Sequence, residues 1–174
     1  PAATGIGTQH GGILVDFNAV KGGIEIIPLD NDWQKAAHVY SDEVLISHRT
    51  DAEKGTPKFE RGKSLSDHQC EMIYISGTAA IRGEESIVTG DVLVQTEITL
   101  ENIQHLIGLE EGREKLPEHS GKLELLRVYL KHEEDAKIVK EDMDKLCPDV
   151  PIVYLYADVC REELLVEIEG IAYL

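Results

Sequence analysis

The sequence predicts an α+β fold in which two helices back a sheet. Apolar residues alternate with period two in several short segments, whereas two other segments carry them at the three- and four-residue steps of a helix. The strand and helix segments do not alternate regularly along the chain, which argues against a doubly wound parallel sheet. A chain of 174 residues is long enough for one domain with a sizeable core.

The first third of the chain is predicted to be rich in strands. The expected strands are residues 12–20, 24–28 and 44–47. The first two would form a hairpin around Gly22 and Gly23. Residues 49–58 are mostly polar and include Gly55 and Pro57, which often punctuate loops. We therefore expect an N-terminal extension over residues 1–56, packed on a core domain over residues 57–174.

The core elements follow in order. They are paired strands at 59–63 and 71–78, a helix from 91 to about 108 or 112, a strand at 123–131, a helix at 133–146, and strands at 152–156 and 164–172. Asp91 suits the N-cap of the first helix, and Cys147 and Pro148 end the second. In the strand after the first helix, Arg127 and Tyr129 share one face.

The last strand carries the most informative pattern. Glu167 and Glu169 lie on one face, and Val166 and Ile168 lie on the other, because strand side chains alternate. A carboxyl group on rigid sheet in apolar surroundings has a raised pKa and can serve as an acid. Alternatively, the two glutamates line a solvated face.

Composition excludes several classes of function. The formal net charge of -16 argues against a nucleic-acid surface, which is normally basic. No apolar run reaches the roughly twenty residues of a membrane span. Three cysteines, an odd number in no metal-ligand spacing, favour a reducing cytoplasm over a disulfide scaffold. The seven histidines are scattered singly, so we expect no metal and no cofactor.

Several of these segments resemble the RidA/YjgF reactive-intermediate deaminase superfamily, some of whose members are called endoribonuclease L-PSP. The matching segments, in order, are residues 72–78, the helix opened by Gly90 and Asp91, residues 127–131 and residues 165–172. The resemblance implies a fold like that of chorismate mutase, a sheet backed by two helices. It also implies a homotrimer with clefts at the subunit interfaces.

Two positions depart from the deaminases. Where they carry an arginine for the substrate carboxylate, this chain has Ile152, and where they carry a cysteine it has Tyr154. Isoleucine cannot form a bidentate pair with a carboxylate. Hydrolysis of enamines or imines is therefore the less favoured hypothesis.

A wider resemblance is to the C-terminal half of chorismatases of the 3-hydroxybenzoate synthase type, which are about twice as long. It rests on residues 1–7, 56–61, 76–81 and 157–161, together with Glu167. It implies a lyase- or hydrolase-type release of pyruvate from chorismate, or from a similar cyclic enol-ether acid, to give a hydroxybenzoate or dihydroxy acid. Glu167 would donate the proton and Cys160 would help to direct the product.

The same resemblance suggests how a small carboxylic acid is bound. Arg61, Arg127 and Arg161, with Arg49 behind them, are the candidate partners of its carboxylates, although each could instead pair with a surface acid. The remaining candidates for the cleft are Tyr74, Ser76, Gly77, Thr78 and Tyr154. The alternatives are a deaminase of imines and a binding domain of the same fold without catalysis.

Overall fold

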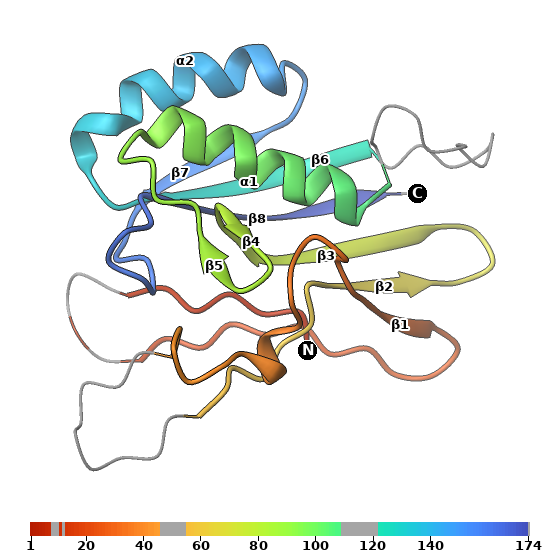
Figure 1. Ribbon diagram of the computed structural model, residues 1–174. Helices are drawn as coiled ribbons and strands as arrows, with labels where there is room; N and C mark the ends of the chain where they lie inside the picture. Colours follow the sequence, from red (N-terminus) through yellow and green to blue (C-terminus); the bar gives the residue numbers. More distant parts are fainter. Residues whose placement is uncertain (8–10, 12, 46–54, 109–121, 174) are drawn as a thin grey trace.

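A six-stranded sheet with two helices on one face forms the centre of the protein (Figure 1), which confirms the predicted α+β fold. The computed structural model describes residues 1–7, 11, 13–45, 55–108 and 122–173. The strand order is β1-β2-β3-β8-β6-β7. All neighbouring strands are antiparallel except β6 and β7, which run parallel.

The elements of the sheet and its helices have the following bounds. They are β1 Glu25–Leu29, β2 Gly62–Ser66, β3 Glu71–Thr78, α1 Val92–Leu106, β6 Lys122–Leu130, α2 Ala136–Leu146, β7 Ile152–Tyr156 and β8 Val166–Tyr173. A separate two-stranded sheet, β4 Ile81–Arg82 and β5 Glu85–Ser86, was not predicted. Short 3₁₀ helices lie at Ala37–Val39 and Glu133–Asp135. No helix within the described ranges is both long and apolar enough to cross a membrane.

The hairpin predicted at residues 12–20 and 24–28 is wrong. Residues 13–20 form no strand, and β1 pairs instead with β2. Ile13 and Phe17 are 94% and 78% exposed, so the described part of the chain does not bury them. The strand predicted at 44–47 is not formed at Val44 or Leu45, and its other residues lie outside the described part.

The first helix begins as predicted at Asp91. Its carboxylate accepts hydrogen bonds from the backbone N–H groups of Leu93 (2.9 Å) and Val94 (3.4 Å), which caps two otherwise unpaired donors. The helix ends before Gly108, whose positive φ of 74° is the conformation that commonly follows a helix. The alternative end at Gly112 lies outside the described residues.

The hydrophobic core lies between the helices and the central strands. Leu126, Val128 and Leu130 of β6 and Val166 and Ile168 of β8 are fully buried and face the helices. The alternation predicted for both strands is therefore confirmed. Arg127 and Tyr129 lie on the other face, where they pair in register with Glu169 and Glu167.

The central strands β3, β8 and β6 pair as neighbours, and β8 approaches the backbone of β6 closely. The paired strands predicted at 59–63 and 71–78 are confirmed as β2 and β3, although β2 begins three residues later. In β8, a Cβ added at Gly170 would lie 2.6 Å from the carbonyl oxygen of Leu125 and 2.7 Å from Leu126 Cδ2. Only glycine fits there, next to the irregular register of β6 between Leu123 and Leu125.

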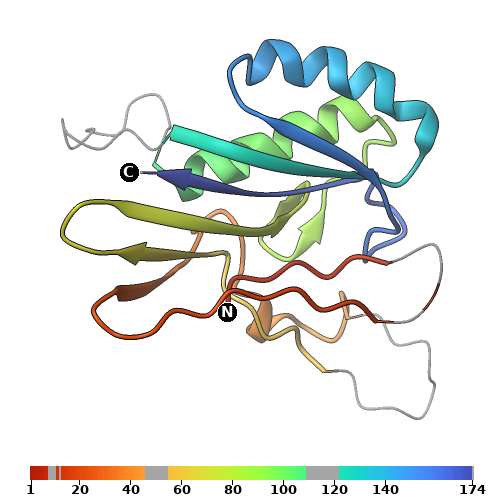
Figure 2. The same ribbon diagram turned by 180° about the vertical axis from the view of Figure 1, so that it is seen from behind.

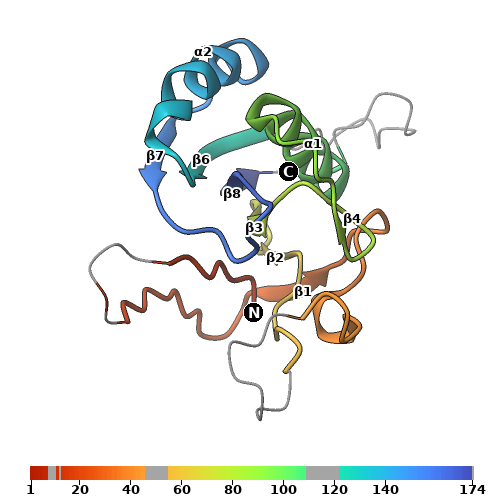
Figure 3. The same ribbon diagram turned by 60° about the vertical axis from the view of Figure 1, so that its left-hand side comes forward.

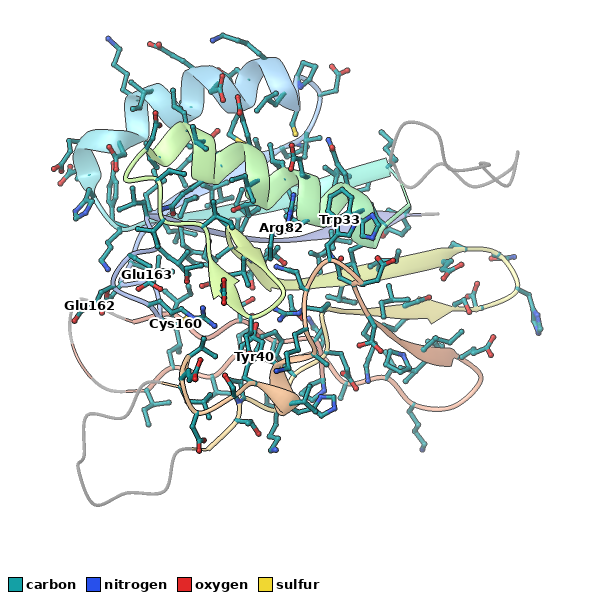
Figure 4. The ribbon with its side chains drawn as sticks, in the orientation of Figure 1. Trp33, Tyr40, Arg82, Cys160, Glu162 and Glu163 are labelled. Atoms are coloured by element: carbon teal, nitrogen blue, oxygen red, sulfur yellow. The ribbon has the colours of Figure 1, made fainter. Side chains whose placement is uncertain are left out.

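An aromatic contact holds part of the N-terminal segment on α1. The Trp33 ring stacks on His105 of α1, with ring centroids 4.0 Å apart. The guanidinium of Arg82 lies 4.6 Å from the centre of the Trp33 ring, and the two labelled side chains are neighbours in Figure 4. The described residues of the N-terminal coil lie on the side of the sheet away from α2 (Figure 3).

Candidate functional site

The strand β8 places Glu167 on the face of the sheet that the helices do not cover. Its side chain is nevertheless buried, at 6% exposed, and in the described part of the chain it accepts no hydrogen bond. Burial raises the pKa of its carboxyl to about 7, and the negative charge of nearby Glu169 raises it further in the same direction. Glu167 is thus a carboxylic acid that keeps its proton near neutral pH.

The second glutamate of the strand has the opposite surroundings. One carboxylate oxygen of Glu169 accepts a hydrogen bond from the Tyr129 hydroxyl at 2.7 Å and an ion pair from Arg127 Nε at 2.7 Å. Burial and the contact with Glu169 raise the pKa of Tyr129 well above its ordinary range, so its hydroxyl stays a donor. The two carboxyl groups of this strand therefore have different surroundings: that of Glu169 is paired with a hydroxyl and a guanidinium, whereas that of Glu167 is buried without such a partner among the described residues.

The end of β3 and the first residues of the chain cover Glu167. A Cβ on Gly77 would collide with Glu167 Oε1 and would lie 2.8 Å from Thr4 Cγ2. Ser76 donates its hydroxyl to the Glu60 carbonyl at 2.5 Å, and Thr78 donates to the Ser76 carbonyl at 2.8 Å. The hydroxyls of Ser76 and Thr78 are thus bound to backbone, while Gly77 contacts the acid directly.

Cys160 lies on the loop between β7 and β8, within electrostatic reach of Glu167. The residue is exposed, but the packing around its sulfur raises the thiol pKa, and the charge of Glu167 raises it too, while Arg161 acts in the opposite direction. Lys131 Nζ donates to the carbonyl of Glu162 at 2.8 Å and helps to hold this loop. Figure 4 shows Cys160 beside Glu162 and Glu163, with Tyr40 below.

Two of the predicted arginines are buried around one tyrosine. Arg61 donates through Nη2 to the Lys35 carbonyl (2.6 Å) and to the Tyr40 hydroxyl, with its guanidinium 5.6 Å from the Tyr40 ring centre. Arg161 lies 5.4 Å from the same ring and donates to the Ser86 hydroxyl at 3.0 Å. Arg127 is different, because its side chain is 46% exposed on the open face beside Glu169. Arg49 lies outside the described residues.

A cleft lies on the outer side of Arg161. Its volume is about 310 Å³, and its lining residues are Glu43, Val44, Glu85, Ser86, Val88, Arg161 and Glu163. Three carboxylates surround a single guanidinium there, so the cleft as it stands in one protomer is a poor site for a dianion. It reaches Arg161 but does not reach Glu167.

The structure does not bring Tyr154 to Glu167. Tyr154 pairs with fully buried Val128 and packs against the helix-covered core, and burial raises its pKa to about 12. Ile152 pairs with Leu126 and lies on the same covered face. An arginine at position 152 would therefore point away from the Glu167 carboxyl within the protomer. Tyr74 lies half-buried on β3, opposite Ile171 of β8.

Sequence comparisons show which known proteins this chain resembles. No protein-family model matches the chain. A chorismatase of Streptomyces rapamycinicus is 35% identical over 98% of this chain and 50% of its own length. A 3-hydroxybenzoate synthase of Streptomyces hygroscopicus is 34% identical over the same shares. The chain is homologous to the chorismatases. It spans about half the length of these curated relatives.

Solved structures agree with the homology. A chorismatase crystal structure superposes with a TM-score of 0.66 at 27% identity, covering 84% of this chain and 43% of that one. The YjgF gene product of E. coli superposes with a TM-score of 0.54 at 16% identity, covering 84% of this chain and 97% of that one. This second likeness shows that the fold is RidA-like, as predicted.

Three residues that shape the site were not predicted for it. Tyr40 contacts both buried arginines, Thr4 accepts a hydrogen bond from Gly77 on the side that faces Glu167, and Gln95 holds the loop that precedes β8. Only Gln95 left a signal in the sequence, because it is a polar residue on the apolar face of a helix. Tyr40 and Thr4 lie in segments without helical or strand periodicity, so the spacing of residues predicted no contact for either side chain.

Proposed function

We propose that this chain carries the acid site of a chorismatase-like reaction, the release of pyruvate from chorismate or a similar cyclic enol-ether acid. The observation that carries the proposal is the buried Glu167 carboxyl, which accepts no hydrogen bond from the described residues and has a pKa of about 7. A group with this pKa is about half protonated at neutral pH, so it can act as a general acid.

In the proposed mechanism, Glu167 protonates the methylene carbon of the enolpyruvyl group. Water captures the resulting oxocarbenium ion and gives up a proton to the Glu167 carboxylate, and the hemiketal then collapses to pyruvate and a dihydroxy acid. Alternatively, the neighbouring ring hydroxyl captures the cation, its C–O bond to the ring breaks, and loss of a ring proton followed by collapse of the hemiketal gives a hydroxybenzoate and pyruvate, which leaves with that oxygen. Aromatisation releases a ring proton, which the Glu167 carboxylate takes back. The negative charge of Glu169 favours this return, because it disfavours a second carboxylate nearby.

Substrate binding is assigned to the cations nearest this face. Arg127 is the exposed one, although it also holds Glu169, so we propose it as a contact for a substrate carboxylate. Arg61 and Arg161 are proposed to shape the site through Tyr40. Cys160, close to Glu167, is proposed to influence which product forms rather than whether the substrate reacts.

The test is release of pyruvate from chorismate, followed with a coupled dehydrogenase. Glu167→Gln should lower turnover by roughly two to four orders of magnitude, the usual contribution of general acid catalysis. Glu124→Gln is the matched control, because Glu124 is a surface residue paired with Lys122 at 3.3 Å. Cys160→Ala should change the ratio of products more than total consumption. Full activity of Glu167→Gln would reject the assignment.

We also propose a homotrimer, as the RidA resemblance implies. Figure 2 shows the sheet from the side opposite the helices. The strand register places exposed Val153, Leu155 and Tyr173 and half-buried Ile171 on this uncovered face. Such a surface is typical of a subunit interface. Light scattering at micromolar concentration tests this, and a strictly monomeric chain would contradict it.

The three free cysteines support a cytoplasmic location.

We consider a second function, binding of the ligand without catalysis, because the chain spans about half the length of its curated relatives. A binding domain without catalysis would bind chorismate in a calorimetric titration but release no pyruvate. Deamination of imines is disfavoured, because Ile152 occupies the arginine position and faces the helices. Rapid hydrolysis of a 2-aminoacrylate-type imine by the unmodified chain would reverse that ranking.

A further inference from the structure

The first seven residues cross the molecule as an extended strap, defined here as Pro1–Gly7. Near its start, Ala2 forms an isolated parallel bridge with Glu60, just before β2. At its end, Gly7 and Asp158 exchange backbone hydrogen bonds of 2.9 and 3.3 Å. The strap therefore runs from the β2–β3 side of the sheet to the loop that carries Cys160 (Figure 3).

The close packing at Gly7 shows that the path of the strap requires glycine at this position. A Cβ at position 7 would lie 2.8 Å from the Cβ of Asp158, so a side chain there would push the strap away from the loop. At the centre of the strap, the Ala3 N–H donates to the Ser76 hydroxyl at 3.1 Å. The Gly77 N–H donates to the Thr4 hydroxyl oxygen at 2.9 Å and to the Ala3 carbonyl at 3.3 Å.

These contacts bring Thr4 to the catalytic acid. Thr4 Cγ2 and Glu167 Oε1 both lie against the space that a side chain on Gly77 would fill. The hydroxyl and the methyl group of Thr4 thus make different contacts. The hydroxyl holds the strap on β3, and the methyl group lies beside the carboxyl, where it occupies volume that water would otherwise take.

We propose that Thr4 is a positioning residue for Glu167, its methyl group shielding the carboxyl from water and its hydroxyl fixing the strap over the site. The proposal rests on the proposed function only for its consequence in catalysis. Its direct consequence is the acidity of Glu167. A carboxyl loses the effect of burial when water reaches it, so removal of the methyl group should make Glu167 more acidic.

Among the described residues, the titratable groups that interact electrostatically with Glu167 come from three elements. They are Glu169 on β8, Tyr129 on β6 and Cys160 on the preceding loop. None of them is on the strap or on the part of β3 that contacts Glu167. A change at Thr4 therefore alters the solvation of Glu167 without adding or removing a charge.

Two substitutions separate the branches of the side chain. Thr4→Ser keeps the hydroxyl and removes the methyl group, whereas Thr4→Val keeps a methyl group and removes the hydroxyl. Thr89→Ser is the matched control, because Thr89 is exposed next to the N-terminus of α1 and far from Glu167 along the fold. All three changes are small enough to preserve the fold.

The readout is the titration of Glu167 itself, followed by the ¹³C carboxyl resonance that disappears in Glu167→Gln. We expect Thr4→Ser to lower the midpoint by about one pH unit or more, as partial rehydration of a buried carboxyl does. Thr4→Val should lower it less, and Thr89→Ser should leave it unchanged. A midpoint unmoved by Thr4→Ser, or moved as far by Thr4→Val, overturns the proposal.

Activity gives a separate readout. If Glu167 is the proton donor, the high-pH limb of pyruvate release should move down in Thr4→Ser by the same amount as the resonance. A shifted resonance in a chain that never releases pyruvate would reject the proposed function but leave the role of Thr4 intact. An unshifted resonance in an active chain would reject the role of Thr4 but leave the proposed function intact.

Discussion

Replacing Glu167 by glutamine should change how the stability of the protein depends on pH. The folded protein keeps the proton on Glu167 up to about pH 7, while an ordinary glutamate releases it near 4.5. At about 1.4 kcal/mol per pH unit, ionised Glu167 therefore costs the folded state about 3 kcal/mol. The contribution of Glu167 to the free energy of unfolding should fall by this amount as the pH rises from 4.5 to 7, with no further fall above that.

Glutamine has nearly the same shape and no charge. The free energy of unfolding of Glu167→Gln, minus that of the wild type, should thus increase by about 3 kcal/mol between pH 4.5 and pH 8. Urea unfolding at a series of pH values and one protein concentration measures this difference. Taking the difference removes every titrating group that the two proteins share.

Glu163 provides the control, because its ionisation should change the free energy of unfolding with the opposite sign to that of Glu167. The pKa of Glu163 is lowered, chiefly by a hydrogen bond from Ser86. Its ionised form therefore stabilises the fold above the ordinary glutamate pKa, and the stabilisation disappears as the pH falls. Glu163→Gln should be less stable than the wild type at pH 7, by an amount that shrinks in acid. Parallel pH curves for the wild type and Glu167→Gln would refute the reasoning.

Two further predictions concern the scaffold. Gln95 donates to the Glu163 carbonyl (3.0 Å) and accepts from the Leu165 N–H (2.8 Å), so Gln95→Leu should lower the free energy of unfolding by about 1–3 kcal/mol, measured in urea, and equal stability would contradict this role. Leu126→Ala removes a fully buried side chain and should cost about 2–5 kcal/mol, while Ile138→Ala on the exposed side of α2 should cost under about 0.5 kcal/mol. Similar losses for the two alanine variants would mean that the core has been misplaced.

The sequence predicted which side chains of β8 share a face, because alternation is a local property of a strand. It could not predict that Glu167 and Glu169, on the same face, would differ so much in surroundings. The difference comes from Thr4 and Gly77, which cover one carboxyl, and from Arg127, which pairs with the other. Those partners come from distant parts of the chain, and period-two spacing contains no information about them.

The wrong prediction for residues 12–20 has a related cause. Ile13 and Phe17 suit a strand by their residue type and spacing, yet a strand forms only where a neighbour supplies hydrogen bonds. In this protomer β1 takes β2 as its partner, which leaves residues 13–20 without one among the described residues. Tyr154 was placed near the acid by resemblance alone, and its register opposite Val128 shows that it belongs to the helix-covered face.

The strap has a consequence for the order in which the protein becomes functional. Thr4 meets Gly77 across 73 positions of sequence, and Ala3 meets Ser76 across the same separation. Contacts between such distant segments form late in folding, because a long loop must close before they stabilise anything. On the proposed role of Thr4, the carboxyl of Glu167 gains its raised pKa only after the strap is seated, so we expect its titration to report a late step of folding.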